Sequence, residues 1–178
     1  MQIYEALRAD HQHVKELLQQ LISLGEADSG KHGELIQEIR DALIPHSRAE
    51  ESVFYNSLRE IQTTKALVGH AYQEHLEAEA LLRTLQVKDT IDADWKGTAI
   101  KLKSAVEDHI AEEEGKVFSA ARQVFTDEEA EMMTEAFEKL KPEIKSEGLV
   151  ATTAELLANL MPPRFAKVFS KYNLESRI

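Results

Sequence analysis

The sequence predicts an all-α fold: an antiparallel up-down four-helix bundle, extended by a fifth helix and a C-terminal helical tail. Three observations favour it. Glycine and proline, which both interrupt helices, are scarce, at 7 and 4 of 178 residues. Apolar residues recur at three- and four-residue steps, which is how a helix presents a stripe to a core. The chain also contains two copies of one helical hairpin, and two hairpins that bury their stripes against each other form such a bundle.

The four bundle helices are expected at residues 2–24, 33–61, 64–86 and 93–125. The polar stretch GEADSGKHG separates the first helix from the second, and VKDTIDAD separates the third from the fourth. Pro45 lies inside the second helix and should kink it or split it in two.

Further helix is expected after the bundle. The segment TDEE is typical of a capping box, with Thr126 as N-cap and Glu129 three residues later. The fifth helix that it starts should end near Gly148. The tail holds another capping pattern, TTAE, and an amphipathic stretch, RFAKVFSKY. We therefore expect two units: residues 1–147, the bundle with its fifth helix, and residues 148–178, a C-terminal extension.

The internal repeat aligns without gaps. DHQHVKELLQQL (10–21) matches EHLEAEALLRTL (74–85), and HSRAEESVFYNSLR (46–59) matches HIAEEEGKVFSAAR (109–122). Each pair shares a histidine, and the second pair also shares two consecutive glutamates at the fourth and fifth positions after it. The repeat implies approximate two-fold symmetry, which would bring the histidine-bearing segments together from opposite sides.

Each bundle helix places one histidine on its apolar stripe: His11, His46, His75 and His109. Three of these are followed one turn later on the same side of the helix by a glutamate: Glu50, Glu79 and Glu113. A lone buried histidine is usually just hydrogen-bonded, but buried unpaired carboxylates and clustered imidazoles carry a large desolvation cost. A multiply charged cation would offset that cost, so the whole set predicts a metal site.

The ligand types narrow the choice of metal. Imidazole and carboxylate without thiolate, in a chain with no cysteine, favour iron, manganese, zinc or cobalt over Cu(I). The candidate ligands exceed what one tetrahedral zinc needs, and a carboxylate from each half could bridge two metals, as in di-iron helix bundles. Ferritin-like bundles use Glu-x-x-His whereas this chain has His-x-x-x-Glu, so that class is disfavoured.

The segments DHQHV, HSRAEESVFY, EHLEAEALL and HIAEEEGKVF resemble the four signature segments of the hemerythrin-like HHE cation-binding domain, over about residues 1–125. The resemblance implies a non-haem centre of two iron ions with an oxo or hydroxo bridge; manganese and zinc are the alternatives. It implies four terminal ligands, His11, His46, His75 and His109, and two bridges, Glu50 and Glu113.

Two departures from the oxygen-carrying hemerythrins bear on function. Those proteins have a fifth histidine where this chain has Glu79, which we therefore include among the candidate ligands. They also use a His-x-x-x-x-Asp pair where this chain has His109 and Glu113. An additional anionic ligand favours the ferric state, so we expect a reaction with oxygen, nitric oxide or peroxide, in sensing or a stress response, rather than reversible oxygen carriage.

Several neighbouring residues are ambiguous. His70 lies about 140° around the helix from the third candidate histidine, so it could bind the same metal only after a local distortion. Tyr72 could donate its hydroxyl toward a bridging oxygen, although a packed tyrosine is the simpler interpretation. Three acidic residues that directly precede candidate histidines are expected to be solvated: Asp10, Glu74 and Asp108.

The alternative function is a structural or interaction bundle in which the metal only stabilises the fold. A metal-dependent hydrolase is disfavoured because no additional nucleophile or base is evident. Whether the centre is enzymatic stays open.

Charge and hydropathy suggest the partners. The net charge of −11 and pI ≈ 5.1 argue against nucleic acid and anionic membranes, and no run approaches the ~18 apolar residues of a membrane span. We expect a small diatomic ligand or peroxide as partner, with a homodimer or a protein bound through the tail as further options. The charged first residues suggest no signal peptide, so a cytoplasmic location is expected.

Overall fold

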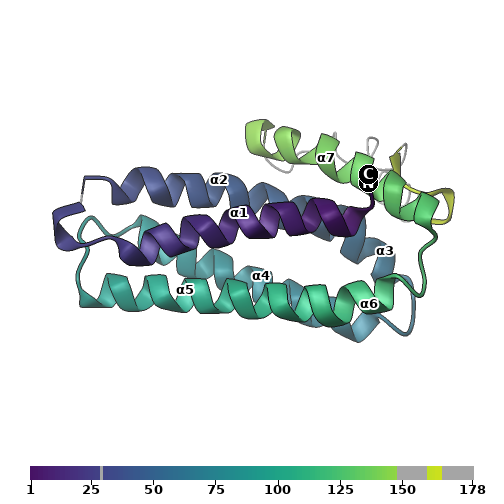
Figure 1. Cartoon of the computed structure of the whole chain (residues 1–178), viewed down its shortest axis with the longest axis horizontal. Coiled ribbons are helices and arrows are strands. Elements are labelled where there is room, and N and C mark those ends of the chain that lie inside the picture. The colour runs from purple at the N-terminus through teal and green to yellow at the C-terminus, as the bar shows by residue number, and fades with distance from the viewer. Residues whose placement is uncertain (29, 148–159, 166–178) are drawn as a thin grey trace, which may run out of the picture.

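The computed structural model describes residues 1–28, 30–147 and 160–165. Four long helices run side by side along the molecule (Figure 1): α1 (Ile3–Ser23), α2 (His32–Glu50), α4 (Lys65–Gln86) and α5 (Ala93–Glu112). α1 packs against α2 and α5, and α4 packs against the same two helices. The prediction of an all-α up-down four-helix bundle is confirmed, and no strand occurs among the described residues.

Two of these helices continue beyond their α-helical part through a π-helical turn. α2 passes through η2 (Glu51–Tyr55) into α3 (Asn56–Arg59), and α5 passes through η3 (Glu113–Val117) into α6 (Phe118–Ala121). The two turns occupy nearly equivalent positions in the internal repeat. π-turns are rare and are frequently found at functional sites. Their paired occurrence beside the candidate ligands therefore favours a functional site at this level of the bundle.

Pro45 does not split its helix. The α-helix continues through Pro45 to Glu50, and the change of geometry comes only at the following π-turn. Proline removes one backbone hydrogen bond and crowds the preceding turn. Packing of α2 against α1, α4 and α7 holds the flanking turns in place, so the helix continues past it.

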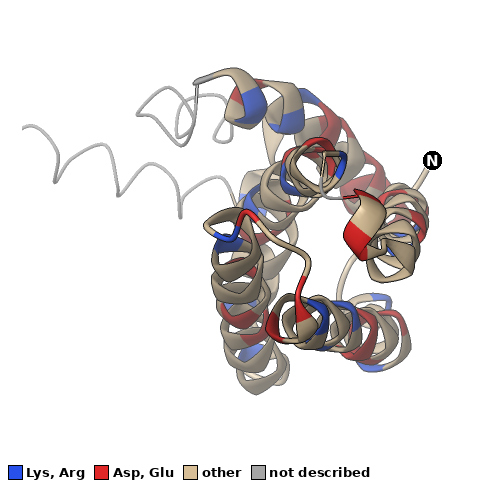
Figure 2. Ribbon diagram, turned by 90° about the vertical axis from the view of Figure 1, so that its left-hand side faces the viewer, with Lys and Arg blue, Asp and Glu red and all other residues tan. Residues whose placement is uncertain are grey.

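The fifth helix, α7 (Asp127–Glu147), lies outside the bundle against α1 and α2 (Figures 1 and 2). Its predicted capping box is confirmed: the Glu129 amide donates to Thr126 Oγ1 at 3.2 Å, and the Thr126 amide donates to Glu129 Oε2 at 2.9 Å. The expected stop at Gly148 and the TTAE pattern lie outside the described residues. In the described part of the tail, Phe165 packs edge-on against Phe125, with ring centroids 5.5 Å apart.

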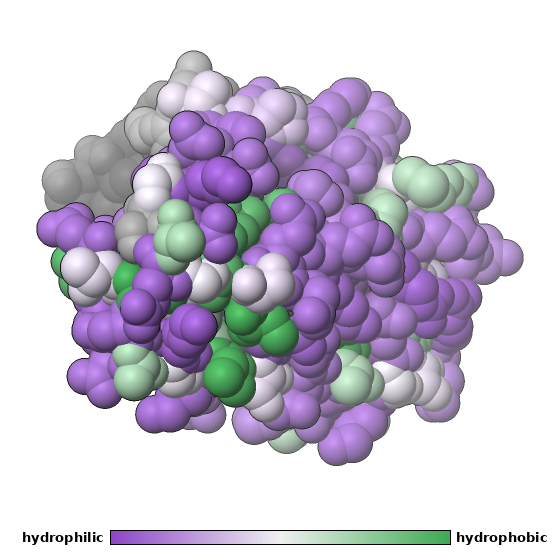
Figure 3. All heavy atoms as spheres, turned by 60° about the vertical axis from the view of Figure 1, so that its left-hand side comes forward, coloured by the Kyte–Doolittle hydropathy of each residue, from purple (hydrophilic) through white to green (hydrophobic). Residues whose placement is uncertain are grey.

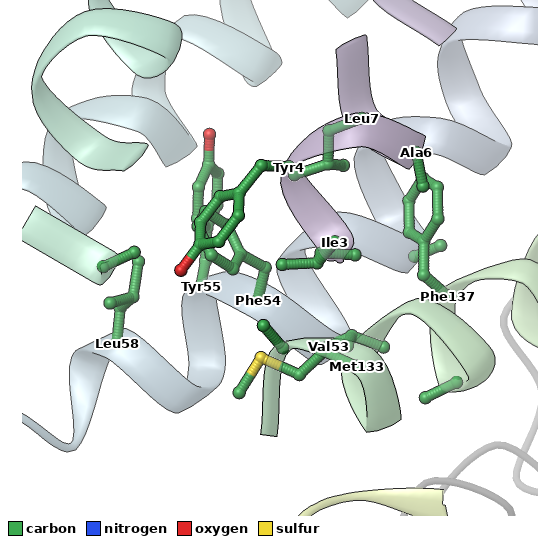
Figure 4. Close-up of a cluster of buried hydrophobic side chains, with 14 of the residues drawn as sticks. Ile3, Tyr4, Ala6, Leu7, Val53, Phe54, Tyr55, Leu58, Met133 and Phe137 are labelled. Atoms are coloured by element: carbon green, nitrogen blue, oxygen red, sulfur yellow. The ribbon is translucent and has the colours of Figure 1, made fainter. Parts of the chain in front are cut away.

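The apolar core consists of two clusters, one toward each end of the bundle. The cluster nearer α7 contains Ile3, Leu7, Phe54, Tyr55 and Phe137 (Figure 4), and the other contains Leu18, Ile39, Leu82, Trp95 and Leu102. On α1, α2 and α4, the candidate histidine stands between the residues of one cluster and those of the other. On α5, His109 directly precedes Ile110, the last residue of the second cluster on that helix. A polar layer therefore separates the two apolar clusters.

The outer surface is mainly hydrophilic. Acidic and basic residues are interspersed along the helices (Figure 2), and the face in Figure 3 is mostly hydrophilic, with hydrophobic side chains confined to small patches. Among the described residues, no helix combines the length and apolarity needed to cross a bilayer.

Candidate metal centre

The polar layer brings the four candidate histidines together inside the bundle. All four, together with two of the candidate glutamates, are no more than 7 % exposed: His11, His46, His75, His109, Glu50 and Glu113. Each comes from a helix whose flanking apolar residues fix its rotation toward the axis. Six of the seven predicted ligands therefore meet in one buried layer; that they bind metal stays a prediction.

The layer contains two groups of three potential ligands. The first is His11, His46 and Glu50; the second is Glu50, His75 and His109. Within each group, one ligand atom from every member lies within 4.8 Å of the others. Glu50 belongs to both groups, which is the arrangement that a carboxylate bridging two cations requires.

The distances inside the groups suit coordination. Glu50 Oε2 lies 3.7 Å from His46 Nε2 and 3.4 Å from His75 Nε2. His75 Nε2 is 3.0 Å from His109 Nε2. Two ligands that each bind a metal at about 2.0–2.2 Å end up about 3 Å apart, so only small adjustments separate these positions from a coordination shell.

Glu113 approaches the same layer from the opposite half of the molecule. Its Oε2 lies 3.1 Å from His11 Nε2, and its Oε1 accepts a hydrogen bond from the Tyr55 hydroxyl at 3.1 Å. The Tyr55 ring also stacks on His75, with centroids 5.6 Å apart. Tyr55 holds one oxygen of Glu113 and leaves the other directed toward His11.

Four polar atoms of the layer are buried with few partners: both carboxylate oxygens of Glu50 have no hydrogen-bond partner, and His11 Nε2 and Glu113 Oε2 face only each other, at 3.1 Å. Leaving such groups unpaired costs about 1–3 kcal/mol each, and more when they are charged. All four atoms belong to side chains that bind iron, manganese or zinc in proteins. The residues present therefore fit a site for one or two divalent cations.

Each histidine is held at its other ring nitrogen by a carboxylate. The Nδ1 atoms of His11 and His75 donate to Glu114 at 3.0 Å and to Glu51 at 2.9 Å. Both glutamates belong to the π-helical turns. Such a bond fixes the tautomer that leaves Nε2 free to bind metal and orients the ring.

The other two histidines follow the same rule. Nδ1 of His46 donates to Asp10 at 3.1 Å, and Nδ1 of His109 donates to Glu74 at 2.9 Å. The two-fold repeat thus extends to these four carboxylates, which we call the outer carboxylates: Asp10, Glu51, Glu74 and Glu114. The expectation that Asp10 and Glu74 are solvated is wrong: each lies beside the histidine of a neighbouring helix. Asp108, the third of these acidic residues, is exposed as expected.

Burial and neighbouring charges set the protonation of the metal-free centre. Burial, reinforced by the nearby Glu113 carboxylate, raises the pKa of Glu50 well above its usual range. Burial alone would do the same to Glu113, but its interactions with Glu50 and His11 outweigh burial and lower the pKa of Glu113. Of the two glutamates, Glu50 is therefore the one that binds a proton more readily.

The pKa values of the histidines are also shifted in different directions by burial and by neighbouring charges. Burial lowers the pKa of His46 to about 4, although Asp10 opposes the shift, and burial also lowers the pKa of His75. At His11, the carboxylates of Glu113 and Glu114 outweigh burial and raise the pKa. His46 and His75 are therefore neutral near pH 7 and ready to bind a cation.

Glu79, the seventh predicted ligand, is not brought to the layer. Its carboxylate pairs with Arg48 and Arg83, and Ala78 takes the inward position after His75. A step of three residues keeps this helix facing the core here, whereas a step of four turns the side chain toward α2. α4 also lacks the π-turn that accompanies the other two glutamates.

The remaining ambiguous residues lie outside the layer. The exposed His70 ring is 3.3 Å from Glu74, and this pair forms a further potential ligand group with Glu112 near the surface. The Tyr72 hydroxyl donates to the Glu51 carbonyl oxygen at 3.3 Å. The tyrosine at the centre is instead Tyr55, whose place in HSRAEESVFY, nine residues after His46, was the available signal.

A cavity of ≈ 20 Å³ adjoins the histidines and is closed by apolar residues that include Val14, Leu43, Val106 and Ile110. This volume is enough for about one water molecule. The centre therefore has room for a ligand of very few atoms.

Comparison with curated proteins gives one named relative. A DNA nickase from Nostoc sp. (strain PCC 7120 / SAG 25.82 / UTEX 2576) is 28 % identical over 145 residues, which cover 82 % of this chain and 40 % of that protein. This chain thus spans less than half the length of that relative. No solved structure matches the chain significantly.

This relative corrects the partner prediction. We excluded nucleic acid on the basis of net charge and expected small ligands or a tail-bound protein; that exclusion is wrong, because a similar protein is named as a DNA nickase. Net charge describes a whole chain and does not rule out a local contact with nucleic acid.

The remaining comparison concerns the bundle itself. The Hemerythrin HHE cation binding domain matches residues 2–121, which span all four bundle helices and every residue of the buried layer. Together with the His/Glu groups, this match supports a metal-binding protein. The chain belongs to the hemerythrin HHE cation-binding domain family.

Proposed function

We propose that this is a di-iron protein whose centre binds or reacts with a small ligand such as oxygen, nitric oxide or peroxide. One iron would lie among His11, His46 and Glu50, and the other among His75, His109 and Glu50. Glu113 would serve as the second bridge. The observation that carries the proposal is the sharing of Glu50 by both three-residue groups.

Iron bound there would supply Lewis acidity and one-electron redox chemistry. The chain's own contribution is to arrange and enclose the centre. The outer carboxylates orient the imidazoles, and the apolar clusters on either side keep bulk water away. Tyr55 holds Glu113 by its hydroxyl, and the ≈ 20 Å³ cavity favours ligands of a few atoms over larger substrates.

The first test is metal stoichiometry. Protein freed of metal by chelation is titrated anaerobically with Fe(II), and the bound iron is counted before and after exposure to oxygen or peroxide. We expect two iron ions per chain and new absorption bands on oxidation. Binding of a single ion, or two ions without any response to oxygen, peroxide or nitric oxide, would contradict the proposal and favour a metal that only stabilises the fold.

Matched variants locate the bridge. Glu50→Gln removes the carboxylate shared by both groups, and we expect it to bind no more than one iron. Glu79→Gln removes the glutamate that pairs with Arg48 and Arg83, and we expect it to bind two. Loss of iron from Glu79→Gln alone would show that the ligands are assigned wrongly.

A second candidate function rests on the relative named DNA nickase. We propose that the chain also acts on or near DNA, with the bundle as its metal-holding part. The test incubates supercoiled plasmid with the full chain and Mn(II), Mg(II) or Fe(II), with a chelator control. Metal-dependent conversion to the nicked circle that Glu50→Gln abolishes would support this function; no conversion with any metal would contradict it.

Four smaller predictions remain. The division into units 1–147 and 148–178 is a proposal that limited proteolysis can test, since a separate tail should be removed without loss of bundle helicity. The cytoplasmic location, the stress-response role and the oxo or hydroxo bridge also stay predictions.

A further inference from the structure

The outer carboxylates follow the two-fold repeat, but the residues that bind Asp10 differ from those that bind Glu74. Asp10, which holds His46, accepts two hydrogen bonds from Lys141 Nζ, at 3.1 Å to Oδ1 and 2.9 Å to Oδ2. Glu74, its counterpart in the other half, faces instead the exposed ring of His70 at 3.3 Å. Lys141 belongs to α7, which lies outside the repeat. The symmetry of the centre is therefore broken by a residue of the fifth helix.

α7 reaches His46 in a second way. The Phe137 ring packs edge-on against the His46 ring, with centroids 5.7 Å apart and planes at 90°. Lys141 Nζ lies 4.5 Å above the same phenylalanine ring, which favours its position by a cation–π interaction. One turn of α7 thus contacts both the imidazole ring and the carboxylate that holds its Nδ1.

The surroundings of Asp10 explain why it needs the lysine. Asp10 borders an open groove of ≈ 450 Å³ that is also lined by His13, Asp41 and Lys145. Without Lys141, the carboxylate could turn into this groove and be solvated there. Lys141 removes that alternative by binding both carboxylate oxygens, so that one of them stays at His46.

We propose that Lys141 is a positioning residue for one of the two metal positions: by fixing Asp10 against His46, it makes the position formed by His11, His46 and Glu50 different from the other. The inference rests on the proposed two-metal centre. It implies that the two cations bind with different affinities and that α7 controls only one of them.

The size of the effect follows from known outer carboxylates. Loss of such a partner typically lowers metal affinity by 10–100-fold. Because Lys141 binds the carboxylate of Asp10 and not the histidine itself, we expect a loss at the lower end of this range. The affinity should fall about tenfold at the position formed by His11, His46 and Glu50. The position formed by Glu50, His75 and His109 should be unchanged, since its outer carboxylates bind other residues.

The test compares Lys141→Met with two matched variants. Lys145→Met removes another lysine of α7, which pairs with Asp41 of α2 at 3.3 Å and does not contact Asp10. Lys141→Arg keeps a cation that can hold the carboxylate. Co(II) or Zn(II) is titrated calorimetrically into each metal-free protein, and the two binding steps are fitted separately. Co(II) absorption reports the geometry of each position.

We expect one of the two steps to weaken about tenfold in Lys141→Met, with the other unchanged, and with near wild-type values for Lys145→Met and Lys141→Arg. Equal weakening of both steps, or the same loss in Lys145→Met, would mean that α7 only stabilises the bundle, and would overturn the inference. No change in either step would overturn it as well.

A metal-free measurement separates this inference from the proposed function. In ¹⁵N-histidine NMR spectra of the metal-free chain, Lys141→Met should change the ring signals of His46 and leave those of His109 in place. If wild-type protein failed to bind a second metal, the proposed function would fail, while these spectra would still decide whether Lys141 positions His46. Unchanged His46 signals would overturn the positioning role alone.

Discussion

Nε2 of His75 lies 3.0 Å from Nε2 of His109. Both nitrogens lie in the ligand group that contains Glu50, and burial raises the pKa of the Glu50 carboxyl well above its usual range. A proton on Glu50 therefore competes in the metal-free centre with a cation for the same carboxylate.

Metal binding should accordingly release protons. Calorimetric titration of the metal-free protein with Zn(II), in buffers of equal pH but different ionisation enthalpy, should show an observed heat that depends on the buffer. The affinity should fall as the pH is lowered from 7.5 to 5.5, because protons compete for the same atoms. Heats that are identical in all buffers would contradict this exchange.

Glu50→Gln should stabilise the metal-free protein. Glutamine resembles the protonated acid. Because the pKa of Glu50 is raised, the contribution of Glu50 to the free energy of unfolding is full at low pH and is lost as the pH rises through the folded-state pKa. We expect a gain of about 1–3 kcal/mol in the free energy of unfolding at pH 8, falling toward zero at pH 5. Urea unfolding at both pH values measures it.

The control is Glu79→Gln, which loses exposed or partly exposed ion pairs. It should lose about 1 kcal/mol or less. A loss of stability in Glu50→Gln at pH 8 would show that the buried carboxylate contributes favourably even without metal.

Acid should destabilise the metal-free protein through His46. Its pKa is lowered to about 4 from about 6.5 when unfolded. The contribution of the neutral His46 ring to the free energy of unfolding is therefore full above pH 6.5. It is lost as the pH falls toward 4, by about 3 kcal/mol in total. His46→Gln should unfold with a shallower dependence on pH in this window, as followed by circular dichroism in urea. Parallel curves for the two proteins would contradict the burial of an uncharged His46.

Tyr55→Phe should affect the centre more than Tyr72→Phe. Tyr55 is fully buried and donates to Glu113, so its loss leaves a buried carboxylate oxygen without a partner, at a cost of about 1–3 kcal/mol. Tyr72 is only partly buried and donates to a backbone carbonyl and to Asn56. We expect a larger fall in stability, and a change in Co(II) absorption, only for Tyr55→Phe. Equal effects of the two variants would argue against a special role for the hydroxyl on Glu113.

The sequence was sufficient for the bundle and for most of the inner layer. His11, His46, His75 and His109 stand on apolar stripes, and the direction of a stripe follows from helical periodicity alone. The same logic failed for Glu79, because positions three and four residues after His75 are both near the inward direction. Only the rotation of the packed helix decides between Ala78 and Glu79.

The outer layer could not be derived in this way. Asp10 and Glu74 precede candidate ligands in sequence, but each binds the histidine of another helix, and the pairing depends on how the helices are arranged. The π-helical turns were missed because one extra residue in a turn does not disturb a short apolar pattern. The link from Lys141 to Asp10 spans 131 residues, so local periodicity contains no sign of it.

The placement of the ionisable layer between the two apolar clusters has a consequence for cooperativity. Without cations, the layer contains buried carboxylate oxygens that have no hydrogen-bond partner, so we expect each end of the bundle to open more readily while the other stays folded. Ions held jointly by all four helices would tie the two ends into one unfolding unit. Amide hydrogen exchange near Leu18 and near Phe54 should then differ in the metal-free chain and converge when the ions are bound.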